Sequence, residues 1–530
     1  MNSKAVGFPD PETNPDYGIW TWDGEKWALG DAAAVPLSPN MKAVAAGNVL
    51  DGDALVLNSD GTVSVVSETV TEGEEVGASI TESAVSESEE PGEISVVYDA
   101  MNNKVVVYYW DGVTTYGMAR VGTVSENNIT FGTPVVFTSN ASYKGVSAIY
   151  DPVTHKHLIF YVEGDLPNGI VKAVVGTVDG DSISFGTPSV VYEGNATFLA
   201  SVYDLGTDKC VVAWSDYDNE KFGTACVGTV SDNRITFGAP VQFTTDKQAE
   251  NIALVYDLAA SKVVIFYCHN KQSSATGRAN ICTVSGSSIS FGPHAIFHTP
   301  NGGQRVSATY DAGASKTVIF YNDVAQTYKG LSIAGTISND TITFGTPVDI
   351  AIQDERVFQI CSTYDSVAKK VIVVYRDHTF NFGRVSAATI SENSITYDSD
   401  KLLDAKIAYS ISTRFNGCVY DPVSDQTIIV YRQDQTGITG AAVYSPIKKP
   451  LIKNSNLTSD NFAGFSEGSY GDGEMAKVSV NGSISDQSGL ITARNCYVQT
   501  DGTVGPVNAD VVAGKALSPT KVLVEGSNYG

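Results

Sequence analysis

Carboxylates are the side chains of this sequence whose type and number could support catalysis. The chain has 59 Asp and Glu residues against 34 Lys and Arg residues, and several acids follow strand-like runs, among them Asp111, Asp216, Asp218 and Asp377. A glycosidase needs two carboxyl groups that face each other about 5–10 Å apart, and no spacing in the sequence pairs these four. The motifs of a nucleophile elbow, a zinc protease and a phosphate-binding loop do not occur. We therefore expect no catalytic residue and no enzymatic activity.

Metal and thiol chemistry have equally little support. The seven cysteines stand singly inside strand-like runs and form no CxxC pair, which favours buried, small apolar side chains. The six histidines include only two close pairs, His155 with His157 and His294 with His298. Asp216, Asp218 and Glu220 offer oxygen atoms to calcium, but the full ligand spacing of a calcium loop is missing. We expect neither a metal site nor a cofactor.

A Tyr-Asp pair recurs seven times along the chain. Its aspartate stands at positions 99, 151, 204, 257, 311, 365 and 421, at spacings of 52, 53, 53, 54, 54 and 56 residues. Because every unit carries the pair, we interpret it as architectural. The aspartate should accept backbone N–H groups of the turn that follows it, and the tyrosine should pack on a strand face.

Each unit between these landmarks predicts four short strands, which we name A to D. In the first unit they cover residues 93–99, 104–110, 116–124 and 129–137, all rich in Val, Ile, Tyr, Phe and Thr. Four antiparallel strands repeated radially form a blade of a β-propeller. The predicted fold is all-β: a seven-bladed β-propeller plus a small β module formed from the N- and C-terminal flanks. A linear β-solenoid is the alternative, but its coils are much shorter than these units.

Strand A supports a closed ring. The position three residues before each tyrosine is always small, and the position one residue before it is always β-branched. We expect both positions to face the propeller axis, which would leave strand A without the arginines and carboxylates of a sialidase-like site. The small residues are Ser95, Ser147, Ala200, Ala253, Ser307, Cys361 and Gly417.

The ends of the chain predict how the ring closes. The seventh unit lacks its fourth strand, and a matching segment stands upstream of the first unit at residues 78–85. We expect that segment to pair with residues 440–444, which removes the free edge of an open sheet. The predicted domains are an N-terminal flank (1–77), the propeller (78–445) and a C-terminal β module (446–530). The flanks carry Asp-Gly hairpin signals at 60–63 and 501–504, and an aromatic hairpin at Trp20 and Trp22.

The loops predict which face of the propeller binds. The A–B and C–D turns repeat from unit to unit, whereas the B–C loops diverge completely and carry aromatics beside Asp or Asn. A rigid scaffold with divergent loops on one face is typical of a binding surface, although drift with local packing of the aromatics is the alternative. The candidate residues for ligand or partner binding are Trp110, Tyr116, Asp216, Tyr217, Phe222, Tyr328, Asp377, Phe380 and Phe382.

Composition excludes some classes of partner. A formal net charge of -25 is unsuited to binding duplex nucleic acid or adsorbing to an anionic membrane. No apolar run approaches the ~18 residues of a membrane span, and the polar N-terminus lacks the apolar core of a signal peptide. The sequence predicts a protein made in soluble form, with no nucleic acid and no membrane insertion.

Repeats of the form VYDxxxxKVVVxY with GTVSxxxITFGTPVVF, preceded by VLNSDGTVSVV, resemble propeller proteins of tailed phages of aquatic bacteria. Residues 488–524 are similar to a tile of phage fibre and virion appendage proteins. The resemblance also covers residues 43–67 and 94–445. The sixth and seventh units depart from it, because they lack the Phe-Gly pair of the ITFGTP stretch. It transfers no catalytic residue.

The resemblance implies a virion location in a tail or capsid appendage, after synthesis in the host cytoplasm. The expected partners are other virion proteins, reached through the flanks, and a host cell-surface glycan or protein; a homo-oligomer on the particle is also expected. We thus predict a non-enzymatic virion structural protein whose loop face binds the host surface or a neighbouring virion protein. The alternatives are a glycan-degrading propeller enzyme and a purely architectural virion component.

Overall fold

β-Strands make up the regular structure of the chain in the computed structural model. It describes residues 20–22, 27–29, 40–72, 79–84, 91–125, 128–164, 169–246, 248–270, 275–299, 302–338, 340–350, 356–378, 382–398, 401–402, 416–432, 439–446, 451–458, 460–480, 483–488, 490, 495–505 and 511–524. Within these residues no helix is long and apolar enough to cross a membrane. The chain divides into two units, residues 71–452 and residues 1–70 with 453–530.

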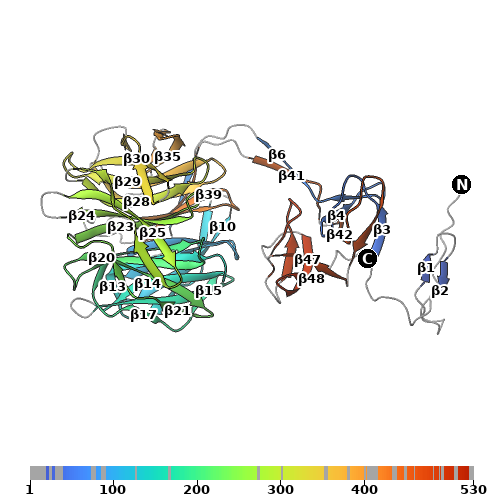
Figure 1. Cartoon of the computed structure of the whole chain (residues 1–530), viewed down its shortest axis with the longest axis horizontal. Helices are drawn as coiled ribbons and strands as arrows, with labels where there is room; N and C mark the ends of the chain where they lie inside the picture. Colours follow the sequence, from blue (N-terminus) through green and yellow to red (C-terminus); the bar gives the residue numbers. More distant parts are fainter. Residues whose placement is uncertain are drawn as a thin grey trace. The chain divides into compact units, whose positions relative to one another are not determined.

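The larger unit is a propeller whose blades repeat one strand order (Figure 1). In the first blade β8 (Pro91–Asp99), β9 (Lys104–Asp111) and β10 (Gly117–Ser125) are strands A, B and C. The predicted fourth strand is two short strands, β11 (Asn128–Phe131) and β12 (Val135–Thr138), which both pair with β10. The strand breaks at Gly132–Pro134 because proline cannot donate to the ladder.

Five more blades follow the same plan. The second has β13 (Ala141–Asp151), β14 (Lys156–Glu163), β15 (Ile170–Asp179), β16 (Ser182–Phe185) and β17 (Ser189–Tyr192). The third has β18 (Ala196–Asp204), β19 (Lys209–Asp216), β20 (Phe222–Ser231), β21 (Arg234–Phe237) and β22 (Val241–Gln242). The fourth has β23 (Gln248–Asp257), β24 (Lys262–Asn270), β25 (Thr276–Ser285), β26 (Ser288–Phe291) and β27 (Ala295–His298). The fifth has β28 (Gly302–Asp311), β29 (Lys316–Asp323), β30 (Lys329–Ser338), β31 (Thr341–Phe344) and β32 (Val348–Asp349). The sixth has β33 (Val357–Asp365), β34 (Lys370–Asp377), β35 (Phe382–Ser391), β36 (Ser394–Tyr397) and β37 (Lys401–Leu402).

The seventh blade closes the ring with a strand from the other end of the propeller sequence. It contains β38 (Asn416–Asp421), β39 (Gln426–Arg432), β40 (Thr439–Ser445) and β7 (Ser79–Ala84). In the antiparallel pair of β40 and β7, Gly440 lies opposite Ala84 and Tyr444 opposite Ile80. The inner strands contact one another in ring order, and β38 contacts β8. The predicted closure is therefore the observed pairing.

Seven hydrophobic clusters fill the propeller, one between each pair of neighbouring blades. This arrangement corrects the prediction that two positions of strand A face the axis. The sheets pack face to face around the ring, so alternate side chains of strand A point at the two neighbouring blades. Ser147 and Ser201 accordingly lie with their Oγ atoms 2.8 Å apart, and the Oγ atoms of Ser307 and Ser362 are also 2.8 Å apart. Small residues recur there because the inner strands are crowded together.

The repeated Tyr-Asp pair joins neighbouring blades. All seven aspartates are buried, with at most 4% of each exposed. Asp99 Oδ1 accepts the N–H groups of Met101 and Asn102, each at 3.0 Å, as expected of a turn-capping residue. Tyr150 of the next blade reaches back, and its hydroxyl oxygen accepts the Met101 N–H at 3.1 Å. The hydroxyls of Tyr310 and Tyr364 do the same for the turns of the preceding blades.

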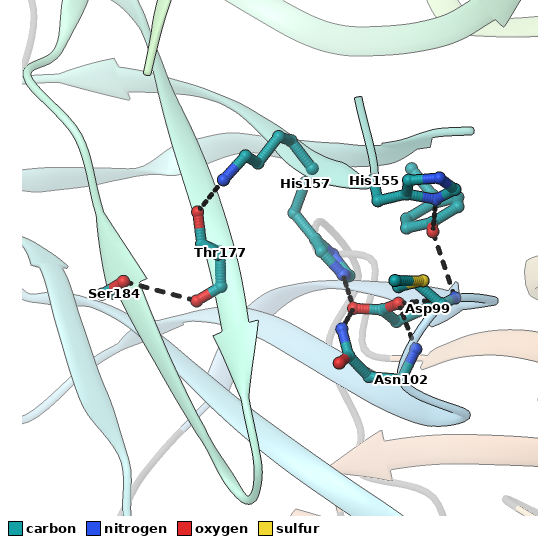
Figure 2. A network of polar contacts seen from close by, with 9 residues as sticks. Asp99, Asn102, His155, His157, Thr177 and Ser184 are labelled. Carbon is teal, nitrogen blue, oxygen red and sulfur yellow. Dashed lines mark hydrogen bonds and ion pairs between the residues drawn. The ribbon is translucent and has the colours of Figure 1, made fainter. Parts of the chain in front are cut away.

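The first of these contacts contains a buried histidine (Figure 2). His157 Nε2 lies 3.1 Å from Asp99 Oδ2, and both side chains are fully buried. Burial alone would raise the pKa of Asp99, but hydrogen bonds from His157 and Asn102 lower it below its ordinary value. His155 Nδ1 is 2.9 Å from the Tyr150 hydroxyl. The histidine pair that the sequence singles out thus serves the contact between two blades.

Tyr150 gives a direct test of this contact. We expect Tyr150→Ala to lower the free energy of unfolding by about 3 kcal/mol or more, because a large packed ring is lost. Tyr150→Phe keeps the ring and removes only the hydrogen bonds, so it should cost about 1 kcal/mol. Chemical denaturation of both variants measures these values. Equal stability of the alanine variant and the wild type would contradict the architectural role.

The Phe-Gly repeat has a steric origin. A Cβ atom on Gly132, Gly186 or Gly238 would lie 2.1, 2.4 or 1.8 Å from a backbone carbonyl oxygen in the C–D turn of the following blade. The sixth unit carries Asp398 instead. Its neighbour, the seventh blade, takes its fourth strand from residues 79–84 and so has no C–D turn of this kind. The departure of the sixth unit from the repeat therefore follows from how the ring closes.

The smaller unit is a β module built from both flanks, as predicted. One sheet has the order β3 (Asn40–Val44), β43 (Met475–Ser479), β42 (Phe462–Ser466), β4 (Ala54–Leu57), β5 (Val63–Val65). The other has the order β44 (Ile484–Asp486), β48 (Lys521–Val524), β47 (Val511–Ser518), β45 (Asn495–Val498), β46 (Val504–Gly505). A further pair is β1 (Trp20–Trp22) with β2 (Trp27–Leu29). The pair of β6 (Glu68–Glu72) with β41 (Leu451–Ser455) includes residues 71–72 and 451–452 of the larger unit.

Candidate functional site

The B–C and D–A loops lie at one face of the propeller, which we call the loop face, and the A–B and C–D turns lie at the opposite face. The connection after strand B covers residues 112–116 in the first blade, 217–221 in the third and 324–328 in the fifth. The A–B turns are alike, since each is a four-residue turn capped by the repeated aspartate. Variation in sequence is therefore concentrated on the loop face.

Buried carboxylates hold the loops of this face. Strand B ends in an acid in five blades, at Asp111, Glu163, Asp216, Asp323 and Asp377. The carboxylate of Asp111 accepts the N–H groups of Val113 and Thr114 at 3.0 and 3.2 Å. Asp323 Oδ1 accepts the Ala325 N–H at 2.9 Å, and Asp323 Oδ2 accepts a hydrogen bond from the Gln326 side chain. Asp111 and Asp323 thus order the loops that follow them.

The third blade brings three predicted residues together. Asp216 is buried, and its carboxylate accepts the Tyr192 hydroxyl at 3.1 Å. Burial raises the pKa of Asp216 above its ordinary value. Tyr217 is 42% exposed, with Lys221 Nζ 5.2 Å from its ring centroid, and Phe222 is half-buried. Asp216 thus supports the loop from below while Tyr217 stands at its surface.

A second acid of the third blade, Asp218, also holds this part of the loop face together. Asp218 Oδ2 accepts the backbone N–H of Asn195 at 2.7 Å, and Asp218 Oδ1 accepts the Asn195 side-chain amide at 2.8 Å. These bonds hold the D–A loop that contains Asn195 to the B–C loop that contains Asp218. Among the residues that the structure describes, no group of three or more His, Cys, Asp or Glu side chains is arranged to hold a metal ion.

The remaining predicted residues lie in the first blade and in the fifth and sixth blades. In the first blade, Trp110 is half-buried and Tyr116 is 37% exposed. Tyr328 of the fifth blade is half-buried against Phe358, and Asp377 is fully buried beside Arg384, 3.1 Å from its Nη2. Phe380 lies outside the described residues. Phe382 pairs with Asp377 across two strands, and its side chain is not described.

The burial of Asp216 and Asp377 bears on their predicted role. Both were expected as polar partners of the aromatics toward a ligand, but both lie below the loops and bond to protein groups. Tyr116, Tyr217 and Tyr328 are the predicted residues best placed to contact a partner.

One arginine of the loop face was not among the residues predicted from the sequence. Arg305 stands in strand A of the fifth blade, five residues before its repeated tyrosine. The two positions considered for strand A carry no arginine, but this third position does. An alignment of the units could have drawn attention to this position. In other units it holds Phe198, Asn251 and Gln359, which are large and differ from one another, unlike the small residues two positions later.

The fold and this face define a class: a closed seven-bladed β-propeller with divergent loops on one side and an added β module. No protein-family model matches the sequence, and no curated protein matches it either.

Solved propeller structures do match the chain. A mutant of AofleA from Arthrobotrys oligospora is 10% identical with a TM-score of 0.40, covering 62% of this chain and 93% of that one. A lectin of Aleuria aurantia in complex with alpha-methyl-L-fucoside is 13% identical with a TM-score of 0.39, covering 59% and 96%. The NanB sialidase of Streptococcus pneumoniae is 10% identical with a TM-score of 0.41, covering 71% of each chain. At such similarity none of them assigns a ligand or an activity to this chain.

Proposed function

We propose that this protein is a non-enzymatic binding component of a phage particle, carried in a tail or capsid appendage. Its loop face would contact a host cell-surface glycan or protein, or a neighbouring virion protein. The virion location rests on the resemblance of the repeats and of residues 488–524 to phage proteins. The β module of residues 1–70 and 453–530 would attach the protein to other virion proteins.

The observation that carries the binding role is the contrast between the two faces. At the same place in the first, third and fifth blades, loops of different sequence stand on one scaffold and are held by buried acids. They present partly exposed aromatics, including Tyr116 and Tyr217. Aromatic rings with nearby hydrogen-bonding groups suit sugar rings and protein epitopes.

The acids of this face support binding without catalysis. A glycoside hydrolase needs two carboxyl groups free to act on the substrate. Asp111, Asp216 and Asp323 instead accept hydrogen bonds from their own loops or from a neighbouring strand. Because the chain carries a net charge of -25, attachment to an anionic cell surface would need a neutral epitope, a local cationic patch or divalent cations.

Exposure of the full chain to an array of bacterial surface polysaccharides tests this proposal. We expect one or more polysaccharides to retain the protein, and we expect no oligosaccharide to be released during prolonged incubation. Analysis of the products by chromatography and mass spectrometry distinguishes binding alone from degradation of the polysaccharide. Release of oligosaccharides of defined size would contradict the proposal and favour a glycan-degrading enzyme.

A further inference from the structure

Cys361 and Cys418 stand on the innermost strands of two neighbouring blades. Cys361 lies in β33 of the sixth blade and Cys418 in β38 of the seventh, and these two strands contact each other. Both side chains are half-buried and pack against one hydrophobic cluster between the two blades. Two thiols from distant parts of the sequence are therefore brought to the same junction.

The repeat shows which positions of neighbouring inner strands meet. The residue three before the repeated tyrosine of one blade faces the residue two before the tyrosine of the next. At two other junctions both positions hold serine, and the Oγ atoms of each pair are 2.8 Å apart. These pairs are Ser147 with Ser201 and Ser307 with Ser362. At the junction of the sixth and seventh blades, the same two positions hold Cys361 and Cys418.

Contacts beside the two cysteines confirm this register. Two residues after each cysteine, the backbone N–H of Tyr420 donates to Thr363 Oγ1 at 3.2 Å. At the next junction, a Cβ atom on Gly417 would lie 2.7 Å from Cγ2 of Val96, and these residues occupy the same two positions of the repeat. Burial raises the pKa of the Cys361 thiol, and a hydrogen bond with the Cys418 thiol raises it further. The two thiols therefore face each other across the junction.

The separation of these positions suits a covalent bond. A disulfide needs two Cβ atoms about 3.5–4.5 Å apart. Side chains whose Oγ atoms meet at 2.8 Å, as in the serine pairs, bring their Cβ atoms near this separation. A thiol pair on the same backbone positions can therefore be joined without moving either strand far.

We propose that Cys361 and Cys418 form a disulfide that fastens the sixth blade to the seventh when the folded protein meets a small-molecule disulfide such as oxidised glutathione. One cysteine, as its thiolate, attacks a sulfur of that molecule, forms a mixed disulfide and displaces one thiolate. The other cysteine thiolate then attacks the protein sulfur of the mixed disulfide and displaces the second thiolate. The protein gives up two protons and two electrons, and the oxidant becomes two thiols.

The bond would reinforce the ring beside its closure. The seventh blade is completed by β7, which pairs with β40 through hydrogen bonds alone. A covalent link from β33 to β38 spans residues 361–418, and a disulfide across a long loop restricts the unfolded chain. In a reducing cytoplasm both thiols stay reduced, whereas oxidising surroundings favour the bond. The propeller would thus become more stable once it leaves a reducing compartment.

Peptide mapping of the folded full chain tests the bond. The chain is incubated with oxidised glutathione in mildly alkaline buffer, since the thiolate is the reacting form. It is then denatured, alkylated and digested with trypsin. We expect residues 357–369 to be recovered linked to residues 415–432 through their cysteines. Cys210 and Cys226 are the internal control: they lie in paired strands but opposite Gly228 and Val212, so they should be recovered alkylated.

Thermal unfolding tests whether the bond fastens the ring. Oxidation should raise the melting temperature of the wild type by at least about 3 °C. The double variant Cys361→Ser with Cys418→Ser carries the side chains found at two other junctions, so it should fold, and oxidation should leave its melting temperature unchanged. Recovery of both cysteines as alkylated peptides, a link that forms only in denaturant, or an equal rise in the double variant would overturn the proposal.

Discussion

A propeller without its closing strand β7 should aggregate, whereas the same propeller with β7 should remain monodisperse. The matched fragments are residues 87–452 and residues 75–452, which both lack the β module and differ only in β7 and its flanks. Removal of β7 leaves backbone N–H and C=O groups of β40 without partners along Gly440–Ser445. An open sheet edge of this kind pairs readily with another chain.

The side chains behind this edge add to the effect. Ala441, Ala442 and Tyr444 of β40 are at most 1% exposed in the closed ring. Size-exclusion chromatography with light scattering measures the mass of each fragment, and thermal unfolding measures its stability. If the shorter fragment is as stable and as monodisperse as the longer one, β7 is not what closes the ring.

Replacement of three tyrosines of the loop face, the exposed Tyr116 and Tyr217 and the half-buried Tyr328, should abolish binding while the fold stays intact. The changes are Tyr116→Ala, Tyr217→Ala and Tyr328→Ala in one chain. The best aromatic anchors of an interface contribute about 2 kcal/mol or more each, so the affinity for a retained polysaccharide should fall at least about a hundredfold. A binding isotherm and a thermal melt, measured on the same preparation, check both parts of this prediction.

Three apolar residues of the opposite face supply the control. Val153, Leu258 and Val423 lie in A–B turns and are 57%, 54% and 60% exposed. Their combined replacement by alanine removes a similar kind of surface without touching the loop face. We expect this variant to bind like the wild type. Loss of binding in the control, with full binding in the tyrosine variant, would mean that the wrong face has been assigned.

The repeats make most of this fold predictable from the sequence. Seven Tyr-Asp pairs at nearly constant spacing predict seven blades. The missing fourth strand of the last unit predicts closure by residues 78–85, and the structure places the closing strand at residues 79–84. The first inference works because a blade is a local unit whose strands follow one another along the chain. The second works because a strand missing from a regular repeat has to be supplied by another part of the chain. The β module is predictable for a different reason: the closure joins both flanks at the same blade.

Side-chain roles at the loop face are less predictable, because they depend on contacts between blades. Asp216 and Asp377 stand beside aromatics in the sequence, but the chain buries them under the loops. The prediction for strand A considered two positions and assigned both to the axis, although packed sheets turn these side chains toward neighbouring blades. Arg305 was not predicted because a bulge sets the direction of its side chain. The same left-handed conformation recurs at Phe198, Asn251 and Gln359, so only a comparison of the aligned units could have pointed to this position.

Amide hydrogen exchange of the full chain, with and without a retained polysaccharide, tests most directly whether the loop face is the binding surface. The account predicts that the ligand slows exchange in residues 112–116, 217–221 and 324–328. It predicts no change in the A–B turns at residues 152–155, 258–261 and 422–425, which lie at the opposite face. Protection confined to those turns, with unchanged exchange in the three loops, would contradict it.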